Sequence, residues 1–305
     1  MNFETFQNTY CNMCGTQRCE GIFSIWINGC SHKDEIDKRH LHIFQRLEDH
    51  YWEAINGYFN SRNVIGIFLQ GSQNYGLDTQ SSDIDTKLII APTFKEITFN
   101  KKPVSTTHVR ANNEHTDFKD IRLYIETFRK QNLNFLEILF TPYKILNSVY
   151  EEQWNRLVKA REAIAHMNPY RSVQSMRGIA LEKYHAMEHP YPSKIDIINE
   201  HGYDPKQLHH LLRVEDYLER YIHGESYEKC LRPTNPEALI WEKTHFRPLA
   251  EAQDMANAAK AHVEKMATEF FATHENKEDP EVNQLLNDVQ YEIMKIAIEK
   301  ELIYE

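Results

Sequence analysis

The sequence predicts an α+β protein, with strands and helices in its first half and helices alone in its second half. Two short apolar runs rich in β-branched residues, 64–69 and 86–90, have the length and composition of buried strands. Apolar residues recur every three or four positions ahead of the first run, which indicates a helix that covers one face of a sheet. After Tyr150 strand patterns vanish, and proline-containing breaks separate helical segments.

Bulk composition narrows the class of protein. The chain has 305 residues, a hydrophobic content of 41% and a net charge of −10, so it can build a genuine core without disulfide bonds. The negative charge argues against a general nucleic-acid coat protein, because Lys and Arg supply affinity for phosphate backbones. No apolar run is long enough for a transmembrane helix, and the first residues do not resemble a signal peptide. We expect a cytoplasmic protein that binds no membrane; the sequence leaves its oligomeric state open.

The first segment of the chain, residues 1–33, is rich in cysteine. Four thiols in so short a piece suit a structural Zn²⁺ ion, whose binding can fold a segment with little core of its own. Buried or free thiols are the alternative, and an iron–sulfur cluster is a lesser one. The predicted zinc ligands are Cys11, Cys14, Cys19 and Cys30. A core from 34 to 150 and a helical part from 151 to 305 complete the chain.

A glycine and a serine stand where the first predicted strand ends. Gly71 lets backbone N–H groups approach a phosphate closely, and Ser72 adds a hydroxyl. The turn continues into a short helical segment expected near residues 74–77. Such Gly-Ser pairs also occur in ordinary turns, so the interpretation depends on the residues beyond the turn.

Two aspartates open the second predicted strand. Asp83 and Asp85 are two positions apart, so on a strand they point to the same face. Paired carboxylates repel each other unless they bind cations, and two Mg²⁺ ions are the recurrent arrangement for moving a phosphoryl or nucleotidyl group. A polar hairpin with solvated aspartates is the simpler alternative. The glycine turn, the spacing and the second strand together favour the metal site.

At these residues the chain resembles the polymerase-β-type nucleotidyltransferase superfamily. Its pattern is an apolar strand, Gly-Ser, a spacer of about ten residues and two acidic residues around an apolar one. The segments 71–76 (GSQNYG) and 82–85 (SDID) are most similar to the predicted nucleotidyltransferases of the bacterial and phage RNA-repair-associated group. The resemblance implies a small mixed β-sheet core with flanking helices, followed by an all-helical domain. It also implies transfer of a nucleoside monophosphate from an NTP.

The superfamily also uses a third carboxylate on a neighbouring strand. The sequence offers Asp117 in a short strand that runs into a helix, with Glu114 as the alternative. Asp120 stands at the N-cap position of that helix. The polar connection from 95 to 113 is interpreted either as a mobile basic flap or as a solvated loop. Glu137, in the apolar segment that resembles N-x-N-x-x-E-L-L-F of the same group, needs a basic or backbone partner for its charge.

The helical half carries a second signature. Asp204 and Pro205 predict a helix start, after which Lys206, His210 and Arg213 share one face with Tyr217. On spacing alone this would be a solvated face. The same group has a G-Y-D-x-K-x-x-x-H-L-x-R-L-like motif, which residues 202–213 match. The resemblance therefore implies that Lys206, His210 and Arg213 bind the nucleotide, as Arg and Lys are suited to phosphates. The residue after the lysine is often His in that motif and is Gln207 here.

These observations predict a Mg²⁺-dependent nucleotidyltransferase with two Mg²⁺ ions. Asp83 and Asp85 would hold the metal, Asp117 would complete the site, and Gly71 and Ser72 would hold the β and γ phosphates. By analogy with the RNA-repair group the acceptor is RNA or tRNA. A protein acceptor, as in protein adenylylation, is one alternative. The other is a nucleotide-binding regulatory or antitoxin-like module with little turnover. Residues 236–305 are expected to form two or three packing helices without chemistry.

Overall fold

The computed structural model describes residues 9–10, 17–18, 33–57, 59 and 64–304. Two short strands, β1 (Thr9–Tyr10) and β2 (Gln17–Arg18), pair antiparallel near the start of the chain. The predicted zinc ligands Cys11, Cys14, Cys19 and Cys30 lie outside the described residues.

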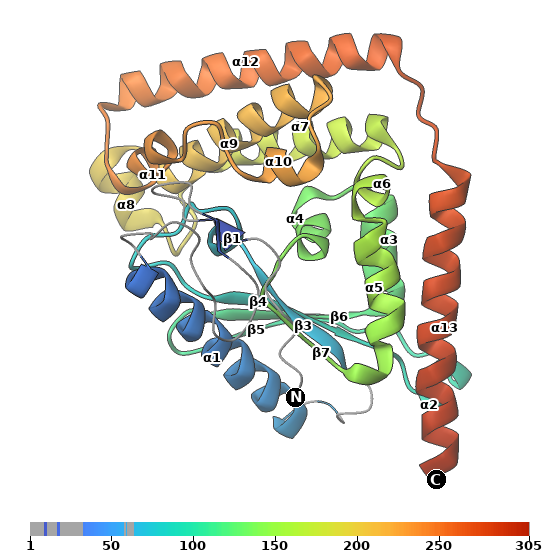
Figure 1. The fold of residues 1–305 in the computed structure, drawn as a ribbon. Coiled ribbons are helices and arrows are strands. Elements are labelled where there is room, and N and C mark those ends of the chain that lie inside the picture. Colours follow the sequence, from blue (N-terminus) through green and yellow to red (C-terminus); the bar gives the residue numbers. More distant parts are fainter. Residues whose placement is uncertain (1–8, 11–16, 19–32, 58, 60–63, 305) are drawn as a thin grey trace.

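The centre of the molecule is a five-stranded mixed sheet (Figure 1). Its order is β5-β6-β4-β3-β7. Strand β4 runs parallel to β6, and the other neighbours are antiparallel. This confirms the α+β class and the two strands predicted from their apolar runs. The bounds are β3 (Val64–Gln70), β4 (Asp85–Ile90), β5 (Ser105–Val109), β6 (His115–Asp120) and β7 (Lys144–Leu146).

The interpretation of residues 95–113 as a flap or loop was wrong. This segment holds the end of helix α2 (Phe94–Thr98) and edge strand β5, which pairs with β6. Four of the five β5 residues are exposed, so the strand has no buried apolar face. Because a one-sided apolar pattern is the usual sequence signal of a strand, its absence hid this one. Strand β7 is shorter still, with three half-buried residues, and it too was missed.

One face of the sheet is covered by the N-terminal helix α1 (Lys33–Gly57) (Figure 1). Ile43 and Leu47 of this helix are fully buried against Leu88 of β4 and Phe118 of β6. The helical periodicity ahead of the first strand is therefore explained by packing on this face. The residues of β4 and β6 that point toward α1 have even numbers.

The opposite face carries the odd-numbered residues of β4 and β6 and meets several short helices. Phe68 of β3 packs on Trp154, with ring centroids 4.4 Å apart. The covering elements are α3 (Ile121–Arg129), α4 (Leu133–Leu136), the 3₁₀ turn η2 (Glu137–Leu139) and α5 (Glu151–Lys159), which comes after the 3₁₀ turn η3 (Ser148–Tyr150). One apolar core extends from this face into the helical half.

The second half of the chain is helical, as predicted. Helix α12 lies across α7 and α9, and α13 returns along α3 and α5, where Arg156 pairs with Glu292 at 2.6 Å (Figure 1). Residues 274–279 separate these last two helices. The bounds are α6 (Arg161–Ala165), α7 (Pro169–Ala186), α8 (Ile195–His201), α9 (Pro205–Ile222), α10 (Tyr227–Leu231), α11 (Pro236–Thr244), α12 (Leu249–Thr273) and α13 (Pro280–Tyr304).

Two predicted helix caps are present. The carboxylate of Asp120 accepts the N–H of Arg122, and that of Asp204 accepts the N–H of Lys206, with Pro205 in the first turn. Within the described residues, no helix is both long and apolar enough to span a lipid bilayer.

Candidate active site

The predicted phosphate turn leaves the end of β3. Gly71 has φ 89°, a conformation that glycine adopts without the strain a side chain would bring. A 3₁₀ turn, η1 (Ser72–Asn74), comes directly after it, slightly earlier than the helical segment predicted near 74–77. The side chain of Asn74 donates to the carbonyl of Leu69 at 3.0 Å and accepts the hydroxyl of Thr141 at 2.6 Å. The turn is therefore held from both sides.

The first predicted metal ligands stand at the start of β4. Asp83 is exposed and lies two residues before the strand, whereas Asp85 is the first residue of the strand and is partly buried. Asp85 Oδ1 accepts the backbone N–H of His115 at 2.8 Å and lies 3.3 Å from His115 Nδ1. Burial raises the pKa of Asp85, although the bond from His115 and the charge of Lys206 oppose this. Its Oδ2 atom has no partner among the described residues.

Asp117 lies on β6 directly opposite Lys87 of β4, on the face that also carries Asp85. Its carboxylate accepts the hydroxyl of Thr107 at 2.6 Å and lies 3.5 Å from the ammonium of Lys87. Among the described residues, no three His, Cys, Asp or Glu side chains gather in a group that could hold a metal ion. The predicted carboxylates therefore share a region of the sheet without converging on one point.

Glu114, the alternative third carboxylate, lies on the opposite side of the sheet. It is 7% exposed and accepts hydrogen bonds from Arg46 and His50 of α1. Burial alone would raise its pKa, but the bonds from Arg46, Asn112 and His50 outweigh burial and lower the pKa to about 2. This carboxylate is thus engaged in packing α1 on the sheet, and of the two candidates only Asp117 shares a face with Asp85.

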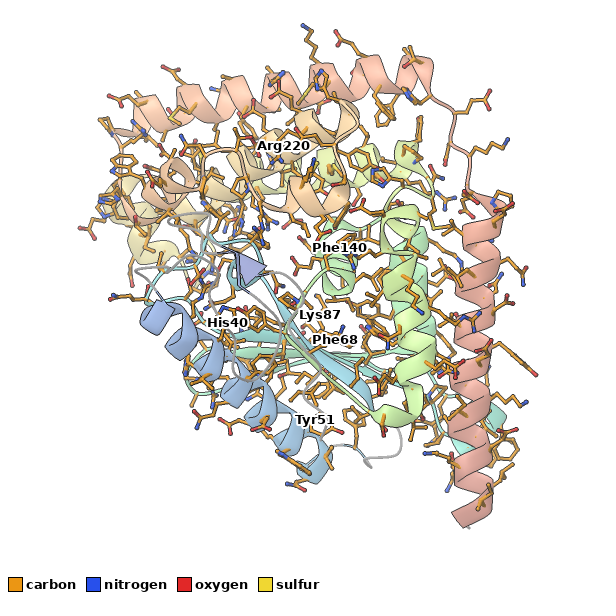
Figure 2. All side chains as sticks on the ribbon, viewed as in Figure 1. His40, Tyr51, Phe68, Lys87, Phe140 and Arg220 are labelled. Carbon is orange, nitrogen blue, oxygen red and sulfur yellow. The ribbon has the colours of Figure 1, made fainter. Side chains whose placement is uncertain are left out.

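Lys87 is a site residue that the sequence reasoning missed. It is 3% exposed, and Figure 2 shows it in the middle of the sheet. Its ammonium lies 4.1 Å from the ring centroid of Phe135 and 3.5 Å from the carboxylate of Asp117. The signal was present in the sequence, because a residue two positions after Asp85 on a strand must point to the same face.

The predicted face of α9 lies against the phosphate turn. Lys206 is exposed, His210 is half-buried and Arg213 is 6% exposed. The guanidinium carbon of Arg213 lies 3.6 Å from the ring centroid of Tyr75, just after the 3₁₀ turn. Burial, together with the charges of neighbouring groups, lowers the pKa of His210, so its ring is neutral at physiological pH.

Arg213 and Tyr217 leave buried polar atoms without partners. Arg213 Nε and the Tyr217 hydroxyl have no hydrogen-bond partner among the described residues. Arg110 and Arg161 also have one buried nitrogen without a partner, but each forms bonds through its other nitrogens. The guanidinium of Arg213 has no acceptor at all within the described part of the chain. Buried donors of this kind mark a place where a ligand can bind.

A second lysine near the turn comes from a region where no chemistry was expected. Lys243 of α11 donates to the carbonyl of Leu77 at 3.1 Å and to the hydroxyl of Ser82 at 3.2 Å. Burial and the charge of Lys206 lower its pKa. Tyr75 and Leu77 also pack on Leu239 of α11. Helix α11, in the region expected only to pack, therefore also places a lysine ammonium beside the turn.

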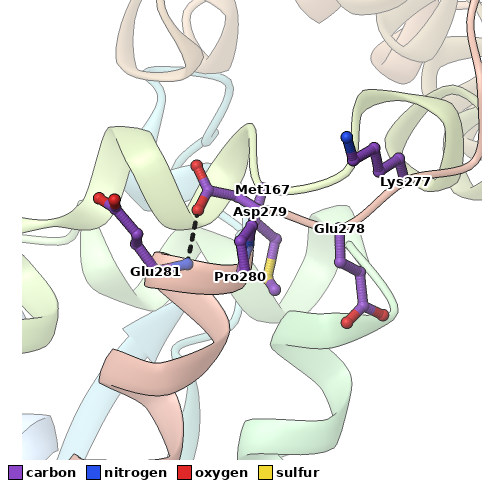
Figure 3. A pocket seen from close by; sticks show the side chains of 6 residues that line it. All are labelled: Met167, Lys277, Glu278, Asp279, Pro280 and Glu281. Atoms are coloured by element: carbon purple, nitrogen blue, oxygen red, sulfur yellow. Dashed lines mark hydrogen bonds between the residues drawn. The ribbon is translucent and has the colours of Figure 1, made fainter.

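A separate hollow of about 480 Å³ lies at the start of α13 (Figure 3). Asp279 there accepts the N–H of Glu281 at 2.9 Å, so this carboxylate caps the N-terminus of α13. The lining is Met167, Lys277, Glu278, Asp279, Pro280 and Glu281. None of the residues singled out in the sequence lies in this hollow.

Comparison of the chain with protein-family models and with curated proteins gives no match.

Proposed function

We propose that the protein is a Mg²⁺-dependent nucleotidyltransferase that moves a nucleoside monophosphate from an NTP to a hydroxyl group, with RNA or tRNA as the first candidate acceptor. One observation carries the proposal. The buried guanidinium of Arg213, which has no acceptor among the described residues, lies over Tyr75, immediately after the Gly71 and Ser72 turn. A buried cation beside a turn of that kind suits the phosphates of a nucleotide.

The carboxylates fit a hard cation. Asp83 is exposed and Asp85 keeps one oxygen free, so both can offer the oxygen ligands that Mg²⁺ prefers. Bound there, Mg²⁺ would neutralise charge on the phosphates of the NTP. The pKa of Asp85 is raised by burial, so a neighbouring cation would also favour its charged form.

The chain's own residues would do the rest by alignment. Arg213 and Lys206 would hold the phosphates, and Ser72 would add its hydroxyl. Asp117 would orient the attacking hydroxyl through its carboxylate, whose two oxygens contact Thr107 and Lys87 in this structure. Lys87 offsets negative charge on this face of the sheet. Positioning and charge stabilisation of this kind account for most of the catalysis in nucleotidyl transfer.

A nucleotide-binding regulatory module is the second candidate. The observation that favours it is the spread of the three carboxylates, because Asp117 is engaged by Lys87 and Thr107 and no three-ligand group is present among the described residues. Such a module would bind an NTP through Arg213 and the phosphate turn and would not turn it over.

The experiment is incubation with each labelled NTP, Mg²⁺ and total RNA. We expect label on RNA and release of pyrophosphate, both lost in the Asp83→Ala/Asp85→Ala double variant and kept in Asp254→Ala, an exposed aspartate on α12. Label that runs with a polypeptide would identify protein adenylylation. Nucleotide binding without any transfer would favour the regulatory module, and transfer that survives the double substitution would refute the mechanism.

For residues 1–33 we propose a structural zinc site. Elemental analysis of the purified protein should find about one Zn²⁺ per chain, lost in Cys11→Ser. Protein that contains neither zinc nor iron would refute this site.

A further inference from the structure

A buried carboxylate already occupies the backbone donor of the phosphate turn. Glu137 is 5% exposed and begins the 3₁₀ turn η2. Its Oε1 atom accepts the N–H of Gly71 at 3.1 Å. The sequence predicted that Glu137 needs a basic or backbone partner, and this bond confirms a backbone one.

This bond fixes the turn relative to the predicted metal ligands. Gln70, the residue before Gly71, pairs with Asp85 in the last register position of β3 and β4. The peptide that links Gln70 to Gly71 therefore lies beside Asp85, the first residue of β4. Because Gly71 has φ 89° and no side chain, its own conformation is weakly restrained, and an external acceptor is needed to hold the N–H in one direction.

The charges of two cations of the proposed site also act on Glu137. Burial raises its pKa, while the charges of Lys87 on β4 and Arg213 on α9 and the bond from Gly71 act in the opposite direction. The carboxylate thus accepts a bond from the turn and is influenced by the charge of one cation on the sheet and one on α9. The bond to Gly71 is what lets this carboxylate hold the turn, while the two cations partly offset the cost of burying its charge.

We propose that Glu137 is a positioning residue of the nucleotide site. Its carboxylate holds the Gly71 peptide so that Ser72 and Arg213 face the same triphosphate. Since Glu137 takes the Gly71 N–H, the phosphate contacts come from Ser72 and Arg213, whose side-chain donors have no partner among the described residues. This refines the expectation that Gly71 itself binds phosphate. The inference rests on the proposed function.

Two conservative variants distinguish the effect of the length of the Glu137 side chain from the effect of its charge. Glu137→Asp keeps the charge and withdraws the oxygen from Gly71 by one methylene. Glu137→Gln keeps an oxygen at the same distance and removes the charge. Asp120→Ala is the control, because Asp120 is a buried carboxylate at 2% exposure that caps α3, and it contacts none of these groups.

The measurements are calorimetric binding of inorganic tripolyphosphate with Mg²⁺ and steady-state transfer from the preferred NTP. For Glu137→Asp we expect a Kd for tripolyphosphate and a KM for NTP about tenfold higher, with kcat changed less than about threefold. Glu137→Gln should stay within about threefold of the wild type in all three. Unchanged binding in Glu137→Asp, or an equal loss in Glu137→Gln, would overturn the positioning role. The positioning role would also be overturned if only kcat fell, and fell in proportion to the fraction of protein that is folded.

The binding arm distinguishes this inference from the proposed function. Wild-type protein that binds tripolyphosphate, weakens in Glu137→Asp and transfers no nucleotide would support the positioning role and overturn the transferase. If the wild type transfers nucleotide and both Glu137 variants bind tripolyphosphate as tightly as the wild type, the transferase is supported and the positioning role is overturned. Wild-type protein that does not bind tripolyphosphate would overturn the inference.

Discussion

Both faces of the central sheet bury charged side chains, but only one face pairs them almost completely. On the α1 face, Glu114 is bonded by Arg46 and His50, and His50 Nδ1 lies 3.0 Å from the hydroxyl of Thr86. That hydroxyl continues to Thr116 at 2.8 Å. A single nitrogen of Arg110 is the exception at this face within the described residues. This network joins α1 to the sheet and has a structural role.

The opposite side leaves some of its buried polar groups without partners. Arg213 has no acceptor and Tyr217 no partner among the described residues, and burial raises the pKa of both Asp85 and Glu137. Buried charge by itself therefore does not mark a functional site in this molecule, since both faces have it. The two faces are distinguished by the missing partner, which a ligand can supply.

The largest expected effect separates the faces by activity. Asp85→Asn should lower nucleotidyl transfer by roughly 10³-fold, because it removes a charge from the proposed metal site. Glu114→Gln should leave the transfer rate per folded molecule within about threefold, because Glu114 faces α1. Rates are compared after the folded fraction is measured by circular dichroism. A large loss in Glu114→Gln with an intact fold would show that the α1 face takes part in the chemistry.

Removal of one arginine from each face should separate them by stability. Arg46→Met leaves Glu114 buried without its main partner, and we expect a loss of about 3 kcal/mol in the free energy of unfolding. Arg213→Met removes a buried cation that has no hydrogen bond to the described residues, so unfolding should change by less than about 1 kcal/mol. Nucleotide affinity should fall about a hundredfold in Arg213→Met and stay unchanged in Arg46→Met. Urea unfolding and calorimetry measure the two quantities.

The contradictory result would be a strongly destabilised Arg213→Met protein with unchanged affinity. Arg213 would then belong to the structural network through Glu137, and the comparison between the two faces would fail.

Acid should weaken the paired face first. The pKa of Glu114 is about 2 in the folded protein against an ordinary value of 4.5, so its contribution is present above 4.5 and lost as pH falls from 4.5 towards 2. The expected loss is on the order of 2 to 3 kcal/mol. Burial lowers the pKa of His50, so its protonation below its ordinary pKa of 6.5 acts in the same direction. Urea unfolding of the wild type and Glu114→Gln from pH 7 to pH 3 measures the difference.

If Glu114→Gln loses as much stability over this range as the wild type, other carboxylates account for the acid sensitivity and Glu114 does not.

The sequence was informative where one residue and its neighbours determine the outcome. The strands at Val64–Gln70 and Asp85–Ile90 are predicted by short apolar runs, and the caps at Asp120 and Asp204 by local hydrogen bonds. The face shared by Lys206, His210 and Arg213 is predicted by helical spacing alone. That this face meets the phosphate turn is a tertiary contact, which the spacing does not contain.

The sequence failed where partners come from distant elements. The sequence favoured Asp117 and kept Glu114 as the alternative, because the choice depends on which side of β6 faces α1. Lys243 joins the turn only because α11 packs on Tyr75 and Leu77. Glu137 was expected to have a partner, but the identity of that partner, Gly71, depends on the fold.

The smallest expected effect compares two helix caps, Asp120 of α3 and Asp204 of α9. Asp204 and Asp120 are both 2% exposed, and each accepts a backbone N–H in the first turn of its helix. Replacement of either by Ala should lower the free energy of unfolding by about 1 kcal/mol, and Asn should restore most of it at both positions. Only Asp204→Ala should also raise the Kd for nucleotide, by about threefold, because α9 carries Lys206 and Arg213 into the proposed site. Equal effects of the two Ala variants on binding would mean that α9 does not position the ligand, and the unpaired Arg213 would then need another explanation.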